Sequence, residues 1–271
     1  MSTASRDVLT PAQRLSQHVR AARQRGPAIV AFLTAGYPSR EQFRRHLAEV
    51  AAKSDVVEVG VPFSDPMADG VTVQRSSLAA LRQGVSLAWI FDELQALAGT
   101  VSTPLVLMGY YNPLLAYGLE RVAERAATVG VAGFIVPDLP PEESGPFEAA
   151  LERRGIALIR MVTPVTPPER LAQICKASQG FIYAVTMTGT TGANAAGGGV
   201  ALSPDTLAYL KRVRELAPVP VCAGFGIRSN AQVKLLDPHV DGAVVGSALV
   251  EVLEKGGDVG AFLDGLRGSA K

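Results

Sequence analysis

The sequence predicts an α/β protein, a single (β/α)8 barrel with an extra N-terminal helix and inserted helices. Short apolar runs recur along the chain, helix-length segments separate them, and no Ser/Gly-rich or charged linker divides the repeats. Strands buried on both faces of a parallel sheet form Val- and Ile-rich runs that do not alternate with polar residues. Eight such units in roughly 250 residues fit one barrel better than two domains. We therefore expect residues 1–271 to form one domain.

The order of the elements follows from these runs and from helix start signals. We expect strands at residues 28–35, 56–60, 105–109, 133–136, 156–162, 181–186, 219–223 and 243–245. Capping-box spacing occurs from Ser39 to Gln42 and from Thr166 to Glu169, and Ser203 precedes Pro204 in the arrangement of an N-cap and first helical residue. The interval 71–104 has room for two helices, with a break near residues 84–86.

Composition favours a protein that binds a small molecule. The chain is 48% hydrophobic, and its 26 basic residues nearly balance its 25 acidic ones, so it lacks the basic field that nucleic acid or an anionic membrane surface requires. Cys175 and Cys222 lie far apart and indicate buried, reduced thiols rather than a disulfide framework or a zinc site. The three histidines lack ligand-like spacing, so we expect no metal. A polar N-terminus and the lack of an 18-residue apolar run predict a cytoplasmic protein.

Glu58 is the first candidate for catalysis. It is enclosed by valines in the predicted strand 56–60, where a charged carboxylate is costly. Burial raises the pKa of a carboxyl group toward the working pH, which suits an acid and base. Catalytic groups of barrel enzymes lie at the C-terminal ends of the strands. Those ends hold Phe32, Thr34, Glu58, Tyr110, Asn112, Asp138, Thr163, Tyr183, residues 224–226, Gly246 and Ser247.

Two glycine-bearing segments predict a phosphate site. "AGFGI" (223–227) ends the seventh strand, and "VVGSALVEVL" (244–253) leads from the eighth strand into a helix beginning near Ser247. Helix N-termini and the loops after strands seven and eight commonly hold phosphate in barrels. The alternative is that these glycines only permit tight turns. Residues 186–200 are rich in small residues and read as a mobile lid or, alternatively, as a slack connector.

Several motifs in fixed order give a resemblance to a known family. They are "AFLTAGYPS", "EVGVPFSDPMADG", "YYNP", "VPDLPPEES", "YAVTMTGTTG", "GFGI" and "GSAL". Over residues 27–253 the chain resembles the tryptophan synthase alpha chain family. The resemblance implies a lyase that splits indole-3-glycerol phosphate into indole and glyceraldehyde 3-phosphate. It also implies an alpha2beta2 heterotetramer, in which pyridoxal phosphate belongs to the beta chain and the alpha chain needs no cofactor.

The resemblance also implies roles for particular residues. Glu58 and Asp69 match the catalytic carboxylates, with Tyr183 near the reacting centre, and Asp69 in a wetter loop should stay ionised and accept the indole N–H. The phosphate contacts match Gly192, Gly226, Gly246 and Ser247, the indole pocket matches Phe32 and Tyr110, and the lid threonine matches Thr191.

Two positions depart from the family pattern. Val71 stands where the family usually has proline, and Met187 where arginine is frequent. Both concern lid closure and signalling to the partner, and neither removes a catalytic group.

Two other functions remain open on the sequence. One is a different phosphate-handling barrel enzyme, such as an epimerase or isomerase, which would share the glycine loops. The other is a weakly active or inactive chain that binds and activates the beta chain through apolar and small residues at 62–66 and 110–115. An assay for indole release, with and without the beta chain, separates these functions.

Overall fold

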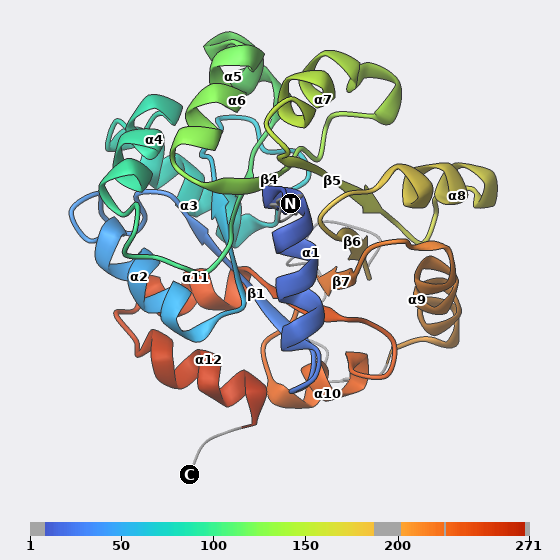
Figure 1. Ribbon diagram of the computed structural model, residues 1–271. Helices are drawn as coiled ribbons and strands as arrows, with labels where there is room; N and C mark the ends of the chain where they lie inside the picture. The colour runs from blue at the N-terminus through green and yellow to red at the C-terminus, as the bar shows by residue number, and fades with distance from the viewer. Residues whose placement is uncertain (1–8, 187–201, 225, 269–271) are drawn as a thin grey trace, which may run out of the picture.

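The computed structural model describes residues 9–186, 202–224 and 226–268. Eight parallel strands follow one another around a closed barrel, and the last strand pairs with the first (Figure 1). The strands are β1 (Ala28–Thr34), β2 (Val56–Gly60), β3 (Leu105–Met108), β4 (Val131–Ile135), β5 (Ala157–Val162), β6 (Ile182–Val185), β7 (Val221–Gly224) and β8 (Gly242–Val245). The predicted barrel is confirmed.

Helices surround the barrel in the described part of the chain (Figure 1). They are α1 (Pro11–Ala22), α2 (Phe43–Lys53), α3 (Val71–Arg82), α4 (Leu87–Ala96), α5 (Tyr111–Tyr117), α6 (Leu119–Thr128), the 3-10 helix η1 (Pro141–Glu143), α7 (Gly145–Glu152), α8 (Pro168–Ala177), α9 (Pro204–Leu216), α10 (Asn230–Leu236), α11 (Ser247–Glu254) and α12 (Val259–Arg267). As predicted, two helices fill the long interval after β2. Gly84, with a φ of 76°, lies in the break, and Ser86 caps α4 through the N–H of Trp89.

Strand side chains alternate between two cores, as the pleat of a strand requires. The outer core lies between the strands and the surrounding helices and includes Val57 and Val59. The inner core fills the barrel with small aliphatic side chains such as Val30 and Val106. Helix α1, the expected extra N-terminal helix, packs Leu15 into the inner core and lies across one end of the barrel (Figure 1). The opposite end, where the strands terminate, is left for the site.

Two strands begin two residues away from the expected start, and every other strand boundary lies within one residue of the expected one. β4 begins at Val131, because Val131 already pairs with Leu105 before a shift in register. β7 begins at Val221, after Pro220. Proline has no N–H to give to a ladder, and the first strand N–H, that of Val221, instead donates to Asp241 Oδ2 at 2.8 Å.

Two of the three predicted helix caps are wrong. Helix α2 begins only at Phe43, so Ser39 lies outside the helix and no side chain caps it. Thr166 Oγ1 accepts the N–H of Thr163 at 3.0 Å, which closes a turn before α8 and leaves that helix without a side-chain cap. Ser203 is confirmed as the cap of α9, where it accepts the N–H of Thr206.

Cys175 and Cys222 are buried free thiols, as predicted. None of the described helices has the length and apolar character needed to cross a membrane.

Candidate active site

Glu58 points into the barrel. Its neighbours Val57 and Val59 belong to the outer core, and alternation along β2 therefore directs residue 58 inward. In the register of the sheet it lies beside Phe32 of β1 and Val106 of β3. Its side chain is almost completely buried, with 1% of the residue exposed. The strand thus presents a carboxyl group to the interior instead of to the helices.

The environment of Glu58 favours its protonated form. Burial is the larger cause and the negative charge of Asp69 the smaller, and together they raise its pKa from 4.5 to about 8. Its Oε2 atom has no hydrogen-bond partner among the described residues. A carboxyl group with a pKa near neutrality can both give and take a proton, and the rise agrees with the expectation from the valine-rich strand.

Asp69 lies in the loop between β2 and α3, close enough to affect Glu58. Burial raises its pKa from 3.8 to about 6, while hydrogen bonding from the Tyr110 hydroxyl opposes this rise. The side chain is half-buried and its neighbours Met67 and Ala68 are exposed, so the loop is wetter than the surroundings of Glu58, as expected. A pKa of about 6 still leaves Asp69 mostly ionised at pH 7.

Tyr110 holds the Asp69 loop in place. Its hydroxyl accepts the N–H of Ala68 at 2.8 Å, and its ring stacks on Phe63 with centroids 5.1 Å apart. The next residue, Tyr111, donates its N–H to Asp138 Oδ1 at 2.9 Å, so the strand-end residue Asp138 anchors the start of α5. The predicted pocket residue Tyr110 therefore lies beside Asp69 and connects the β2 and β3 loops.

Glycines at two strand ends make room for aromatic site residues. A Cβ atom on Gly60 would lie 2.5 Å from the ring of Phe32, and one on Gly224 would lie 2.7 Å from the hydroxyl of Tyr183. Tyr183 belongs to the inner core, and burial followed by the charges of Glu58 and Asp69 raises its pKa well above 10.0. Sequence reasoning missed Gly60, although a glycine inside a strand is a recognised sign of close approach.

The ends of β7 and β8 lie side by side where the sequence predicts a phosphate site, and we call Gly226, Gly246 and Ser247 the anion cradle. The two strands are adjacent, with Gly224 paired to Val244. Gly226 follows β7 with a φ of 79°, a left-handed conformation that favours glycine. Gly246 precedes α11, whose first residue is Ser247, and no side chain caps this helix. An uncapped helix N-terminus offers free N–H groups and a favourable dipole to an anion.

Phe32 lies between the carboxyl pair and the cradle. It pairs in register with Glu58 on one side, and on the other its Cβ lies 3.7 Å from the position that a Cβ on Gly246 would take. The strands β2, β1 and β8 are consecutive in the barrel. The structure therefore brings Glu58, Phe32 and Gly246 together along one arc of the rim.

The remaining predicted positions are not all described by the structure. Three of them lie outside the described residues: Met187, Thr191 and Gly192. Val71 is the exposed first residue of α3.

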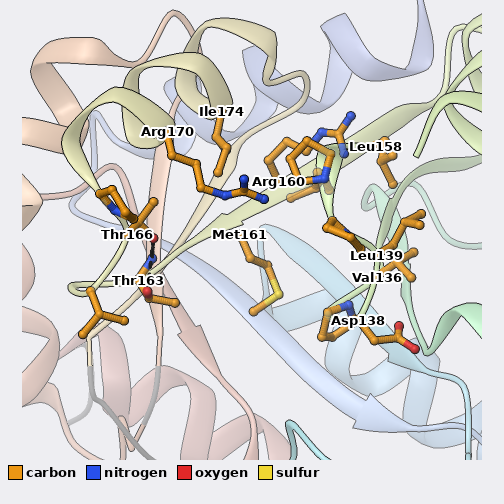
Figure 2. A pocket seen from close by; sticks show the side chains of 16 residues that line it. Val136, Asp138, Leu139, Leu158, Arg160, Met161, Thr163, Thr166, Arg170 and Ile174 are labelled. Atoms are coloured by element: carbon orange, nitrogen blue, oxygen red, sulfur yellow. Dashed lines mark hydrogen bonds between the residues drawn. The ribbon is translucent and has the colours of Figure 1, made fainter. Parts of the chain in front are cut away.

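A separate cavity of about 470 Å³ lies beside β5, between the η1 and α8 segments (Figure 2). Arg160 lines it from β5 and points to the side of the strand opposite Met161 (Figure 2). Arg160 is only 7% exposed, but its charge is paired with Glu148 at 2.7 Å. The second arginine of the cavity, Arg170, is paired with Glu142. Since each cation already has a carboxylate partner, this cavity suits a phosphorylated substrate less well than the barrel mouth does.

The described part of the chain contains no cluster of side chains suited to bind a metal ion. No group of three or more His, Cys, Asp or Glu side chains is arranged there to hold a metal ion.

The fold and the site define a (β/α)8-barrel protein that carries a carboxyl pair and an uncapped helix end at one rim. The chain belongs to the tryptophan synthase alpha chain family, whose sequence model matches residues 19–261. It is 46% identical over 253 residues to the tryptophan synthase alpha chain of Desulfovibrio desulfuricans, covering 92% of this chain and 97% of that relative. The corresponding chain of Solidesulfovibrio magneticus is 45% identical over 242 residues, covering 89% and 93%.

Solved structures agree with this assignment. Tryptophan synthase of Mycobacterium tuberculosis superposes with a TM-score of 0.86 at 34% identity, covering 96% of this chain and 98% of that one. The tryptophan synthase complex of Pyrococcus furiosus gives a TM-score of 0.79 at 31% identity, covering 90% and 98%. The resemblance seen in the motifs is confirmed.

Proposed function

We propose that the chain is the alpha subunit of tryptophan synthase and cleaves indole-3-glycerol phosphate to indole and glyceraldehyde 3-phosphate. Family membership supports the reaction. The observation that carries the proposal is the buried, inward-facing carboxyl of Glu58, whose pKa of about 8 depends in part on the charge of Asp69. The same rim holds an uncapped helix end for a phosphate.

The cleavage is a retro-aldol reaction, and we infer that Glu58 moves both protons. It donates a proton to C3 of the indole ring, which leaves positive charge on the ring nitrogen. Removal of the proton from the adjacent hydroxyl forms the aldehyde, and the carbon–carbon bond breaks as its electrons return to the ring. A group with a pKa near the working pH serves for both transfers.

Asp69 and the aromatic residues hold the indole ring. The ionised Asp69 accepts the ring N–H and stabilises the charge that develops on the nitrogen. Tyr110 keeps the Asp69 loop in position through the N–H of Ala68. Phe32 supplies an apolar surface next to Glu58, and Tyr183 lies inside the barrel near both carboxyl groups.

The phosphate is held at the other side of the opening. Gly226, Gly246 and Ser247 present backbone N–H groups and a hydroxyl, and the dipole of α11 favours the dianion. Gly192 is proposed as a further phosphate contact and Thr191 as the lid residue that reaches Asp69.

We further propose that this chain is a single domain, acts in the cytoplasm without a cofactor of its own, and assembles with a beta chain into an alpha2beta2 heterotetramer. The related Pyrococcus furiosus structure is a tryptophan synthase complex. Exposed apolar side chains near the site loops provide surface for such a partner: Met67 is 85% exposed and Val165 is 73% exposed. Pyridoxal phosphate would belong to the beta chain, which joins the released indole to serine.

The direct test is incubation of the purified chain with indole-3-glycerol phosphate, alone and with a tryptophan synthase beta chain. We expect indole and glyceraldehyde 3-phosphate in equal amounts. Failure to release either product in both conditions would reject the proposed activity and favour a chain that only activates its partner.

A further inference from the structure

An ion pair outside the site joins the two sides of the anion cradle. Arg228 lies two residues after Gly226, and Glu251 lies one helical turn after Ser247 on α11. Arg228 donates from Nη1 to Glu251 Oε2 and from Nη2 to Glu251 Oε1, both at 2.8 Å. A bidentate pair fixes the orientation of its two partners as well as the distance between them. The pair therefore fixes both the distance and the orientation between the β7 loop and α11, which a single hydrogen bond would not do.

The β7 loop is also held on its own side. Gln232, in the first turn of α10, donates from Nε2 to the carbonyl oxygen of Gly226 at 3.0 Å. Its Oε1 accepts the N–H of Arg228 at 2.7 Å. One side chain thus fixes both Gly226 and the backbone of Arg228 relative to α10. The position of Gly226, which has no side chain to hold it, depends on this support.

Glu251 reaches a third element, next to the second carboxylate of the site. Thr72 Oγ1 donates to Glu251 Oε1 at 3.3 Å, and Thr72 lies three residues after Asp69 in the first turn of α3. Hydrogen bonding from Arg228 is the main cause that lowers the pKa of Glu251, so the pair stays charged at neutral pH. Glu251 is the junction between the cradle and the Asp69 segment.

We propose that Arg228 and Glu251 are positioning residues that set the spacing between the Gly226 loop and the N-terminus of α11 and so determine the affinity for the substrate phosphate. This inference rests on the proposed function. Backbone donors bind an oxyanion well only when they converge at hydrogen-bond distance. Neither side chain needs to touch the phosphate, because the effect passes through the backbone that each one holds.

A purely electrostatic role for Arg228 predicts the opposite change in phosphate affinity for the Glu251→Gln variant. If the guanidinium attracted the phosphate through its charge alone, Glu251→Gln would remove a competing negative charge and strengthen phosphate binding. If the pair instead positions the backbone donors of the cradle, Glu251→Gln breaks the bidentate pair and weakens phosphate binding. The sign of this single change separates the two roles.

The experiment is calorimetric titration of the full chain with glycerol 3-phosphate, together with steady-state cleavage of indole-3-glycerol phosphate. We expect Arg228→Ala and Glu251→Gln each to weaken glycerol 3-phosphate binding roughly three- to tenfold, and the double variant to lose little more, since the residues act as a unit. KM should rise by a similar factor while kcat stays within about twofold. Arg228→Lys keeps the positive charge but cannot form the bidentate pair, so it should bind glycerol 3-phosphate as weakly as Arg228→Ala does.

Arg44→Ala is the matched control. Arg44 forms another bidentate pair, with Glu93 at 2.7 and 3.1 Å, between α2 and α4. We expect its removal to leave the affinity for glycerol 3-phosphate unchanged. Thermal unfolding of each variant verifies that it is folded under the conditions of the titration.

Three results would overturn the inference. They are unchanged or tighter binding by Glu251→Gln, wild-type affinity in Arg228→Lys, and no binding of glycerol 3-phosphate by the wild-type chain. A wild-type chain that binds glycerol 3-phosphate but releases no indole would reject the proposed reaction, while the binding series would still decide the positioning role.

Discussion

Asp69 lies close enough to Glu58, inside the barrel mouth, for its negative charge to raise the pKa of the Glu58 carboxyl. The two residues come from one strand and the loop that follows it, and the Tyr110 hydroxyl holds that loop through the N–H of Ala68. Burial contributes the larger part of the rise at Glu58. Together these effects hold one carboxyl protonated near neutral pH while the other is mostly ionised, which is the difference that the proposed roles in proton transfer and charge stabilisation require.

Replacing Glu58 should remove catalysis and preserve binding. Glu58→Gln keeps the size of the side chain but can neither give nor take the proton. We expect kcat for indole release to fall on the order of 10³-fold, with affinity for glycerol 3-phosphate unchanged. Quantifying indole over time tests this expectation, and wild-type turnover by the variant would remove Glu58 from the mechanism.

Replacing Asp69 should act on Glu58 as well as on the substrate. Asp69→Asn removes the negative charge that raises the pKa of Glu58, so the pKa of Glu58 should move down from about 8. NMR titration of ¹³C-labelled glutamate carboxyls follows this shift directly. An unchanged pKa for Glu58 would show that the two groups are not coupled.

The buried carboxyl should also cost stability in a defined pH window. Glu58 has a folded-state pKa of about 8 and an ordinary value of 4.5. Below pH 4.5 the carboxyl is protonated in both the folded and the unfolded states. Between pH 4.5 and pH 8 it ionises in the unfolded state but stays protonated in the folded state, so the free energy of unfolding falls as pH rises. Glu58→Gln has no such loss. We expect its free energy of unfolding, relative to wild type, to rise by roughly 3 to 5 kcal/mol between pH 4 and pH 9.

Urea titrations of both proteins across that range measure the difference. A gap between the two proteins that does not change with pH would mean that the pKa of Glu58 is the same in the folded and unfolded states, and so is not raised by burial.

Gly60 should tolerate no side chain, because the ring of Phe32 occupies the space. A Cβ there would lie 2.5 Å from that ring, and overpacking of this kind costs about 1–3 kcal/mol. Gly60→Ala should therefore lower the free energy of unfolding and raise KM, since Phe32 must shift within the site. Gly265→Ala in α12 is the control: its added Cβ meets nothing within 4 Å, and stability should hold or improve. Equal stability of the two variants would contradict the packing argument.

The sequence predicted what depends on local pattern. The valine-rich run 56–60 predicted both a strand and an unusual carboxyl environment, and alternation along that strand explains why Glu58 faces inward. The pattern could not reveal contacts between distant segments. The pairing of Arg228 with Glu251 requires the β7 loop and helix α11 to meet in space. The space that Gly60 leaves for Phe32 likewise depends on the pairing of β1 with β2. Ser39 has capping-box spacing, but the chain makes a turn before α2 begins, and spacing alone does not show this.

The most direct test of the account is a crystal structure of the chain with a non-cleavable indolyl-alkyl phosphate. The account predicts the phosphate within hydrogen-bond distance of the backbone at Gly226, Gly246 and Ser247, and the indole ring between Glu58 and Asp69. A ligand bound instead in the cavity beside β5, next to Arg160 and Arg170, with the barrel mouth empty, would contradict this prediction.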